Sequence, residues 1–185
     1  MKTNIVVEKI ENIDSKKLRG GYYTPQEITD FICKWAINSP AQKVLEPSCG
    51  DGNFIESAIR RFNLSGLIKG IELIDKEAQK SKIRAAKYGL NSNTIQNADF
   101  FSYISTAKEK FDVVIGNPPF IRYQNFPEEH RELALKMMHE LKLHPNKLIN
   151  IWVPFLVISA SKLKPSGKLA MVIPAELFQV KSIPL

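Results

Sequence analysis

The chain has 185 residues, enough for one domain with a sizeable buried core. Hydrophobic residues make up 44% and charged residues 24% of it, which excludes an intrinsically disordered chain. Basic side chains outnumber acidic ones by 26 to 19, and the resulting net charge of +7 favours a polyanionic partner. The start lacks the apolar core of a signal peptide, and no apolar run is long enough to span a membrane, so we expect a cytoplasmic protein with no membrane partner.

The first predicted element is a helix over residues 25–38, with Thr24 as N-cap and Pro25 at the first helical position. Its apolar side chains recur at helical spacing and predict one buried face, which comprises Ile28, Phe31, Ile32 and Trp35.

After this helix, short apolar runs typical of strands alternate with segments whose apolar residues recur at helical spacing. Strands are predicted at residues 43–48, 67–73, 93–98, 111–117 and 168–174. Helices are predicted from Asp51 to Phe62, from Asp75 to Tyr88, at 127–143 and at 147–163, the last one bent or interrupted at Pro154.

Strands separated by helices indicate βαβ units, which build a parallel sheet with helices on both faces. We therefore predict an α/β, doubly wound, Rossmann-like and mostly parallel sheet. After the fifth strand only ELFQVKSIPL remains, so the sheet is expected to lack two further strands and to end in an exposed edge. Ligands of such folds bind at the carboxyl ends of the strands, and the motifs below all fall there.

Three predicted strand ends carry acids. The first leads into a glycine turn, LEPSCGDGNF (45–54), the second ends in Glu72, and the third is followed by Asp99 and Phe100. A carboxylate such as Glu72 can accept both ribose hydroxyls of a nucleoside, and Asp99 can accept from an adenine amine. Alone, each has a plainer interpretation: a tight turn, a solvated charge, and a helix cap before a core aromatic. Together they favour a nucleoside cofactor without a phosphate, such as S-adenosyl-L-methionine.

The fourth strand ends in GNPPF (116–120), the most specific motif of the chain. Two prolines remove two N–H donors and leave carbonyl acceptors, beside the amide oxygen of Asn117. Two acceptors that converge on one NH2 group localise the lone pair of a weakly nucleophilic amine, and Phe120 offers a face on which a base can stack. The alternative is a proline-rich turn with a buried Phe.

These motifs, in this order, resemble those of the gamma-type DNA adenine-N6 methyltransferases of restriction–modification systems. The likeness covers roughly residues 18–180 and rests on GGYYTP (20–25), LEPSCGDGNF (45–54), GIELID (70–75), NADF (97–100), NPPF (117–120), NIWVPF (150–155) and KPSGKLAMVIPAELFQV (164–180). It implies that the enzyme methylates N6 of an adenine flipped out of double-stranded DNA, with S-adenosyl-L-methionine as methyl donor.

The resemblance also implies roles for individual residues. The catalytic residues would be Asn117, Pro118, Pro119 and Phe120. The cofactor-binding residues would be Tyr23, Thr24, Glu46, Ser48, Gly50 and Gly52 at the methionine end, Glu72 and Leu73 at the ribose, and Asp99, Phe100 and Phe155 at the adenine.

The sequence departs from this family at its ends. We expect an N-terminal extension (1–19), a catalytic domain (20–180) and a short tail (181–185), without the family's target-recognition domain. A separate specificity domain or subunit is therefore an expected partner. About 20 residues precede the first motif, so no endonuclease activity is expected from the chain.

Other interpretations stay open at this point. Protein-glutamine and ribosomal RNA amine methyltransferases use the same catalytic motif, and a truncated chain could bind the cofactor without turnover. The segment 121–147 is either a DNA contact or a helical lid over the site. It contains His130, His139 and His144, whose spacing does not form HExxH, so no metal site is expected.

Overall fold

The described residues, 23–62, 67–145 and 150–175 of a computed structural model, contain one five-stranded parallel sheet. The strands are β1 (Val44–Glu46), β2 (Ile68–Glu72), β3 (Ile95–Asn97), β4 (Phe111–Gly116) and β5 (Leu163–Met171). Their order in the sheet is β3-β2-β1-β4-β5. The predicted α/β, doubly wound, parallel fold is confirmed. The predicted extension (1–19) and tail (181–185) lie outside the described residues, and the domain boundaries stay a prediction.

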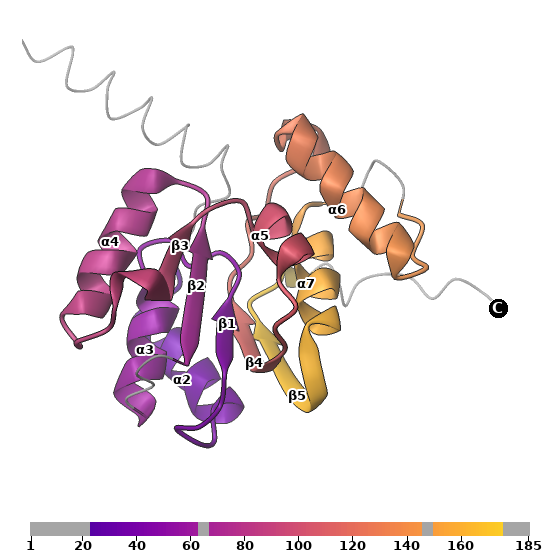
Figure 1. The fold of residues 1–185 in the computed structure, drawn as a ribbon. Coiled ribbons are helices and arrows are strands. Elements are labelled where there is room, and N and C mark those ends of the chain that lie inside the picture. The colour runs from indigo at the N-terminus through magenta and orange to yellow at the C-terminus, as the bar shows by residue number, and fades with distance from the viewer. Residues whose placement is uncertain (1–22, 63–66, 146–149, 176–185) are drawn as a thin grey trace, which may run out of the picture.

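Helices cover both faces of the sheet (Figure 1). On one face lie α2 (Gln26–Ala36), α3 (Asn53–Phe62) and α4 (Asp75–Ala86). On the other lie α5 (Phe100–Thr106), α6 (Glu128–Glu140) and α7 (Trp152–Ser161). Two short 3-10 turns, η1 (Ser92–Thr94) and η2 (Tyr123–Asn125), complete the described elements.

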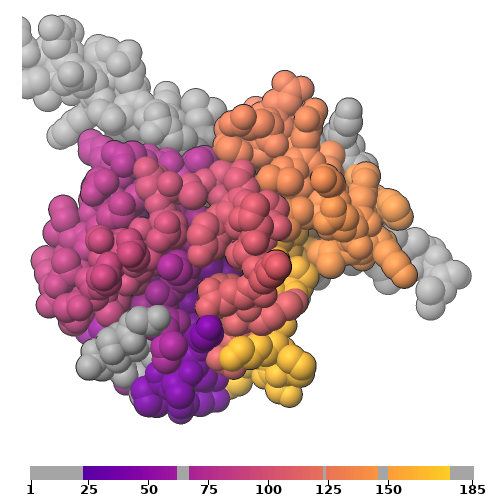
Figure 2. All heavy atoms as spheres, in the orientation of Figure 1, coloured from indigo at the N-terminus to yellow at the C-terminus, as the bar shows by residue number. Residues whose placement is uncertain are grey.

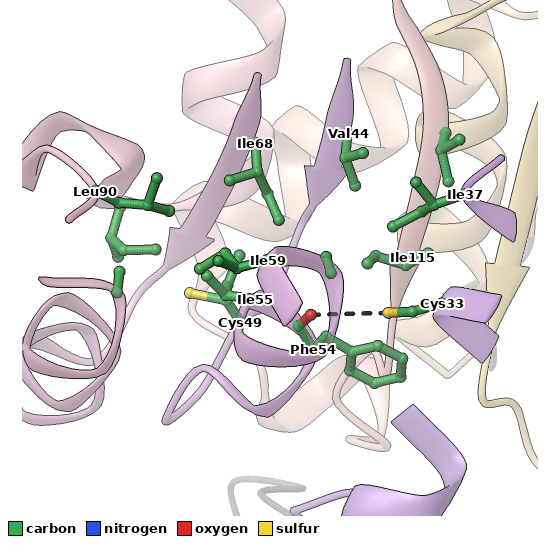
Figure 3. Packing of buried hydrophobic residues seen from close by; sticks show 14 of the residues in the cluster. Cys33, Ile37, Val44, Cys49, Phe54, Ile55, Ile59, Ile68, Leu90 and Ile115 are labelled. Carbon is green, nitrogen blue, oxygen red and sulfur yellow. Dashed lines mark hydrogen bonds between the residues drawn. The ribbon is translucent and has the colours of Figure 1, made fainter. Parts of the chain in front are cut away.

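The core divides along the sheet into two apolar clusters, because a parallel strand buries both of its faces. The cluster under α2 and α3 contains Val44, Ile55 and Ile115 (Figure 3). The thiol of Cys33 also lies there and contacts the carbonyl oxygen of Phe54 at 3.8 Å. Both free cysteines of the chain are buried, so they act as small apolar side chains.

The predicted buried face of α2 is wrong except at Ile32, which is partly buried against the core. Phe31 and Trp35 are 69% and 56% exposed, whereas Thr29 and Cys33 are buried. Small side chains allow α2 to approach α3 closely, and the hydroxyl of Thr29 is satisfied by Ser57 at 2.7 Å. Close helix packing therefore overrides the burial of the larger apolar side chains.

The predicted N-cap is also wrong. The helix begins at Gln26 after Pro25, whose carbonyl accepts the N–H groups of Ile28 and Thr29. No side chain caps this helix, and the Thr24 hydroxyl turns toward Asn117 instead.

Three other expectations need correction. Pro154 does not bend α7, because it lies in the first helical turn, where its missing N–H has no partner to lose. The helix α5 has no range among the predicted helices, although the plainer interpretation of Asp99 as a helix cap pointed to it. β5 begins at Leu163, five residues earlier than expected, and its pairing with β4 shifts register around Ser166, whose φ is +64°.

β5 is the terminal strand of the described sheet, and none of its residues is buried. This agrees with the prediction that the fifth strand forms an exposed edge of the sheet. Among the described residues, no helix combines the length and the apolar character needed to cross a membrane.

Candidate functional site

The candidate site lies where the strand order of the sheet reverses. From β1 the chain continues to β2 and β3 on one side, whereas β4 and β5 lie on the other side. The chain leaves β1 toward α3 on one face and β4 toward α6 on the other face, and ligands of doubly wound sheets bind at the carboxyl ends of the strands at such a point. The predicted residues Glu46, Ser48, Glu72 and Asn117 all lie at or just after the carboxyl ends of β1, β2 and β4.

Two hydroxyl groups hold Asn117 from elements far away in the sequence. Its side-chain Nδ2 donates to Thr24 Oγ1 at 3.1 Å, and its backbone carbonyl accepts from Ser48 Oγ at 3.2 Å. With Nδ2 placed on Thr24, the amide Oδ1 lies on the other side of the side chain, away from Thr24. Thr24 itself is buried, and its carbonyl accepts from Asn53 Nδ2 at 3.0 Å. The structure thus joins the predicted YYTP, LEPS and NPPF motifs.

Glu72 lies under the glycine turn that follows β1. Its Oε2 accepts the N–H of Gly50 at 2.8 Å, and its Oε1 accepts the N–H of Ile74 at 2.8 Å. Burial raises the pKa of Glu72, and the two backbone N–H groups oppose that shift by stabilising the carboxylate. Each oxygen keeps a further lone pair that can accept from a hydroxyl group.

Glu46 is 1% exposed at the end of β1, and its Oε2 has no hydrogen-bond partner among the described residues. Burial raises its pKa well above the usual glutamate range, and the negative charges of Glu72 and Asp51 raise it further. A buried, incompletely bonded carboxyl is costly, and a cationic ligand group would lower that cost.

Asp99 caps α5, as its plainer interpretation predicts. Its Oδ1 accepts from the backbone N–H and the hydroxyl of Ser102 at 2.8 and 2.9 Å. The Nδ1 atom of His130 lies 3.3 Å from the same oxygen. No described residue bonds to Oδ2, so this second oxygen can accept a hydrogen bond from a ligand.

Phe100 and Phe155 stack on each other, with ring centroids 4.9 Å apart and an interplanar angle of 21°. Both are nearly fully buried, at 2% and 4% exposure. Because the rings are in direct contact, a purine has no space between them. Each can contact an adenine only with an edge or with its outer face.

Some predicted residues have structural partners of their own. The hydroxyl of Tyr23 donates to Glu77 on α4 at 2.7 Å, and its ring lies over Gly50, whose φ is +53°. A side chain on Gly52 would collide with Ser81 of α4, so Gly52 is needed for helix packing. Leu73 is 41% exposed. Their roles at a cofactor stay predictions.

The predicted catalytic motif follows β4 directly. Pro118 is buried, and Pro119 and Phe120 are half-buried. The backbone of Ile121 then accepts the N–H of Ile151, which joins the loop to the start of α7. This anchoring fixes the loop on both sides, because Thr24 and Ser48 hold its other end.

Sequence reasoning missed two residues that contact the site. Asn53 belongs to the LEPSCGDGNF motif, and its place at the start of α3 was a usable signal. His130 had no such signal, because its contact with Asp99 spans α5 and α6. In the described part of the chain, no group of three or more His, Cys, Asp or Glu side chains could hold a metal ion.

The chain is similar in sequence to known proteins. Residues 48–184 match the model of the Eco57I restriction-modification methylase family. The chain is 30% identical over 175 residues to modification methylase CviBIII of Paramecium bursaria Chlorella virus NC1A, covering 92% of this chain and 41% of that relative. It is 27% identical over 170 residues to type II methyltransferase M.HincII of Haemophilus influenzae, covering 91% and 30%. The chain thus spans less than half the length of these relatives.

Solved structures share the fold. The DrdV–DNA complex superimposes with a TM-score of 0.70 at 19% identity, covering 90% of this chain and 22% of that one. The methyltransferase subunit of a type I restriction-modification system from Streptococcus thermophilus gives 0.68 at 19% identity, covering 84% and 35%. At these identities the likeness establishes the fold alone, which is that of a Rossmann-like methyltransferase domain. The chain belongs to the Eco57I restriction-modification methylase family.

Proposed function

We propose that this chain is the catalytic domain of a site-specific DNA methyltransferase that methylates N6 of adenine within a restriction–modification system. The observation that carries the proposal is the convergence of Thr24 and Ser48 on Asn117 at the reversal point of the sheet. The names of the relatives, modification methylase and type II methyltransferase, support the same reaction class. We also propose a cytoplasmic location, where the DNA and the cofactor are both present.

The acids at the strand ends fit S-adenosylmethionine. Glu46 offers a buried carboxyl oxygen that suits the ammonium group, and Glu72 offers both oxygens to the ribose hydroxyls. Asp99 Oδ2 suits the amine of the adenine. This set favours a nucleoside with a cationic tail, since none of these three groups would attract a phosphate. When bound, this cofactor supplies a methyl group activated by a sulfonium.

Asn117 then prepares the target amine. Because its Nδ2 is engaged by Thr24, its Oδ1 is the end that accepts an N–H from the target. A carbonyl of the Pro-Pro pair accepts the other N–H, since neither proline can donate. Two acceptors draw the amine toward a tetrahedral geometry and free its lone pair for attack. Holding the amine in place beside the methyl donor contributes about 7–11 kcal/mol to catalysis.

The amine of a paired adenine is buried in the duplex, so the base has to leave the stack before it can react. Phe120 lies three residues after Asn117 and offers a face for the extruded base, worth about 1–3 kcal/mol. Double-stranded DNA is therefore the proposed substrate, and a separate specificity domain or subunit is the proposed reader of its sequence.

The test is methyl transfer itself. The chain is incubated with S-adenosylmethionine carrying a labelled methyl group and with unmethylated DNA, which is then digested to nucleosides. The proposal expects label in N6-methyladenine. Asn117→Ala removes the acceptor and should lower the rate by at least about 100-fold, while Asn125→Ala, a nearby exposed asparagine, should not.

Three outcomes would contradict the proposal. Label in N4-methylcytosine would place the chemistry on another base. Transfer to protein or ribosomal RNA, with none to DNA, would favour the other amine methyltransferases that share the catalytic motif. Tight binding of the cofactor without any transfer would indicate a domain that binds the cofactor but does not turn over.

A further inference from the structure

Helix α6 packs against α5 and α7, and α5 begins directly after the proposed adenine site at the end of β3. In the space-filling view it forms an outer layer, coloured orange, at the edge of the molecule (Figure 2). Its inner side chains Ala134 and Met138 are buried in the same apolar cluster as Phe100 and Phe155. The helix is therefore part of the folded body beside Asp99.

One polar side chain of α6 reaches Asp99. His130 Nδ1 lies 3.3 Å from Asp99 Oδ1, and both side chains are largely buried, at 14% and 4% exposure. The other ring nitrogen, Nε2, lies 3.6 Å from Glu129, which is 83% exposed and screened by solvent. The buried contact is therefore the stronger of the two.

Aromatic packing holds His130 in this place. Its ring centroid lies 5.8 Å from that of Phe126, which is buried. Phe126 in turn meets the edge of Phe101 at 6.2 Å with an interplanar angle of 86°. These contacts fix the imidazole relative to α5, so the Asp99 carboxylate has polar contacts from both α5 and α6.

We propose that His130 is a positioning residue that makes the cofactor site selective for a 6-amino purine. The proposal rests on the cofactor site proposed above. Ser102 and His130 both engage Oδ1 of Asp99, and this leaves Oδ2 to accept the amine of an adenine. Without His130 the carboxylate is held only by Ser102, its own neighbour in α5, and can rotate.

Selectivity follows from the chemistry of position 6. An amine donates to Oδ2, whereas the oxygen of a hypoxanthine would face the carboxylate and be repelled by it. One hydrogen bond to a charged group corresponds to about a tenfold preference or more. That preference requires the Asp99 carboxylate to stay in one orientation, because a carboxylate that can rotate could turn away from the hypoxanthine oxygen and avoid the repulsion.

The experiment compares the dissociation constants of S-adenosylhomocysteine and S-inosylhomocysteine by calorimetry. The wild-type chain is expected to favour the adenine ligand by about tenfold or more. His130→Leu should reduce the preference to about threefold or less. His130→Asn places an amide donor where Nδ1 lies and should keep most of the preference, whereas His130→Gln places its donor further out and should lose it.

His139→Leu, on an exposed position of the same helix, is the matched control and should leave the preference unchanged. Thermal melting checks that each variant is folded, and if the Leu variant is not, the comparison of Asn with Gln decides. A Leu variant that loses affinity for both ligands equally would overturn the role of His130 alone. A wild-type chain that binds neither ligand would overturn the cofactor site itself.

Discussion

Substitution of Glu46 tests the proposed cofactor site directly. Its buried carboxylate destabilises the folded chain, and we expect it to contribute to binding only when a cationic ligand group lies beside it. Glu46→Gln keeps the shape of the side chain and removes the charge. We expect the variant to be more stable than the wild type at neutral pH and to bind S-adenosylhomocysteine less tightly. The two effects should have opposite signs, which a purely structural glutamate would not produce.

The size of the effect depends on pH. The folded pKa of Glu46 is raised, so the folded chain retains a proton that the unfolded chain loses above about pH 4.3. The wild type therefore loses stability as pH rises from there toward the folded pKa, by up to about 1.4 kcal/mol per pH unit. For a domain of this size, that corresponds to roughly 3–6 °C in melting temperature per pH unit.

Thermal unfolding of wild type and variant between pH 5 and pH 8, without ligand, measures this difference. The advantage of the Gln variant should be small at pH 5 and should grow with pH. Its affinity for S-adenosylhomocysteine should fall by about tenfold or more, as expected for losing a bond to a charged group. Glu132→Gln, on an exposed position of α6, is the control for a change in net charge. A constant stability difference together with unchanged affinity would refute the reasoning.

Two further predictions concern packing and orientation. Gly52→Ala places a Cβ 2.7 Å from Ser81 Oγ and should destabilise the fold by about 1–3 kcal/mol. Gly89→Ala, also at positive φ but with nothing within 4 Å, should cost about 1 kcal/mol, and equal losses in chemical denaturation would argue against the close packing. Thr24→Val removes the acceptor for Asn117 Nδ2 and should lower kcat by about tenfold, while Thr24→Ser restores it; an unchanged kcat in the Val variant would show that this bond does not orient the amide.

Much of the fold could be predicted from local patterns. The strands β1, β2 and β4 lie in short apolar runs bounded by turn residues, and the alternation of strands with helices predicts a parallel sheet. The site followed from the same reasoning, because the carboxyl ends of parallel strands meet at one edge. Glu46, Glu72 and Asn117 therefore lie near one another although they are far apart in the sequence.

The predictions that were wrong or missing concern features that depend on contacts between separate helices and loops. α2 carries apolar side chains on two sides, and only its packing against α3 decides that Cys33 is buried and Trp35 exposed. Thr24 resembles an N-cap by position, but Asn117 lies within reach of its hydroxyl. His130 is one of three histidines with no motif, and only the docking of α6 brings it to Asp99.

The most direct test of the whole account is a crystal structure of the chain with sinefungin. We expect the amine group of the ligand's amino-acid tail to contact Glu46, its ribose hydroxyls to donate to Glu72, and its adenine amine to donate to Asp99 Oδ2. Asn117 should keep its bond to Thr24 and direct Oδ1 toward the space beside the ligand. A ligand bound elsewhere, or an Asn117 side chain turned away from that space, would contradict the account.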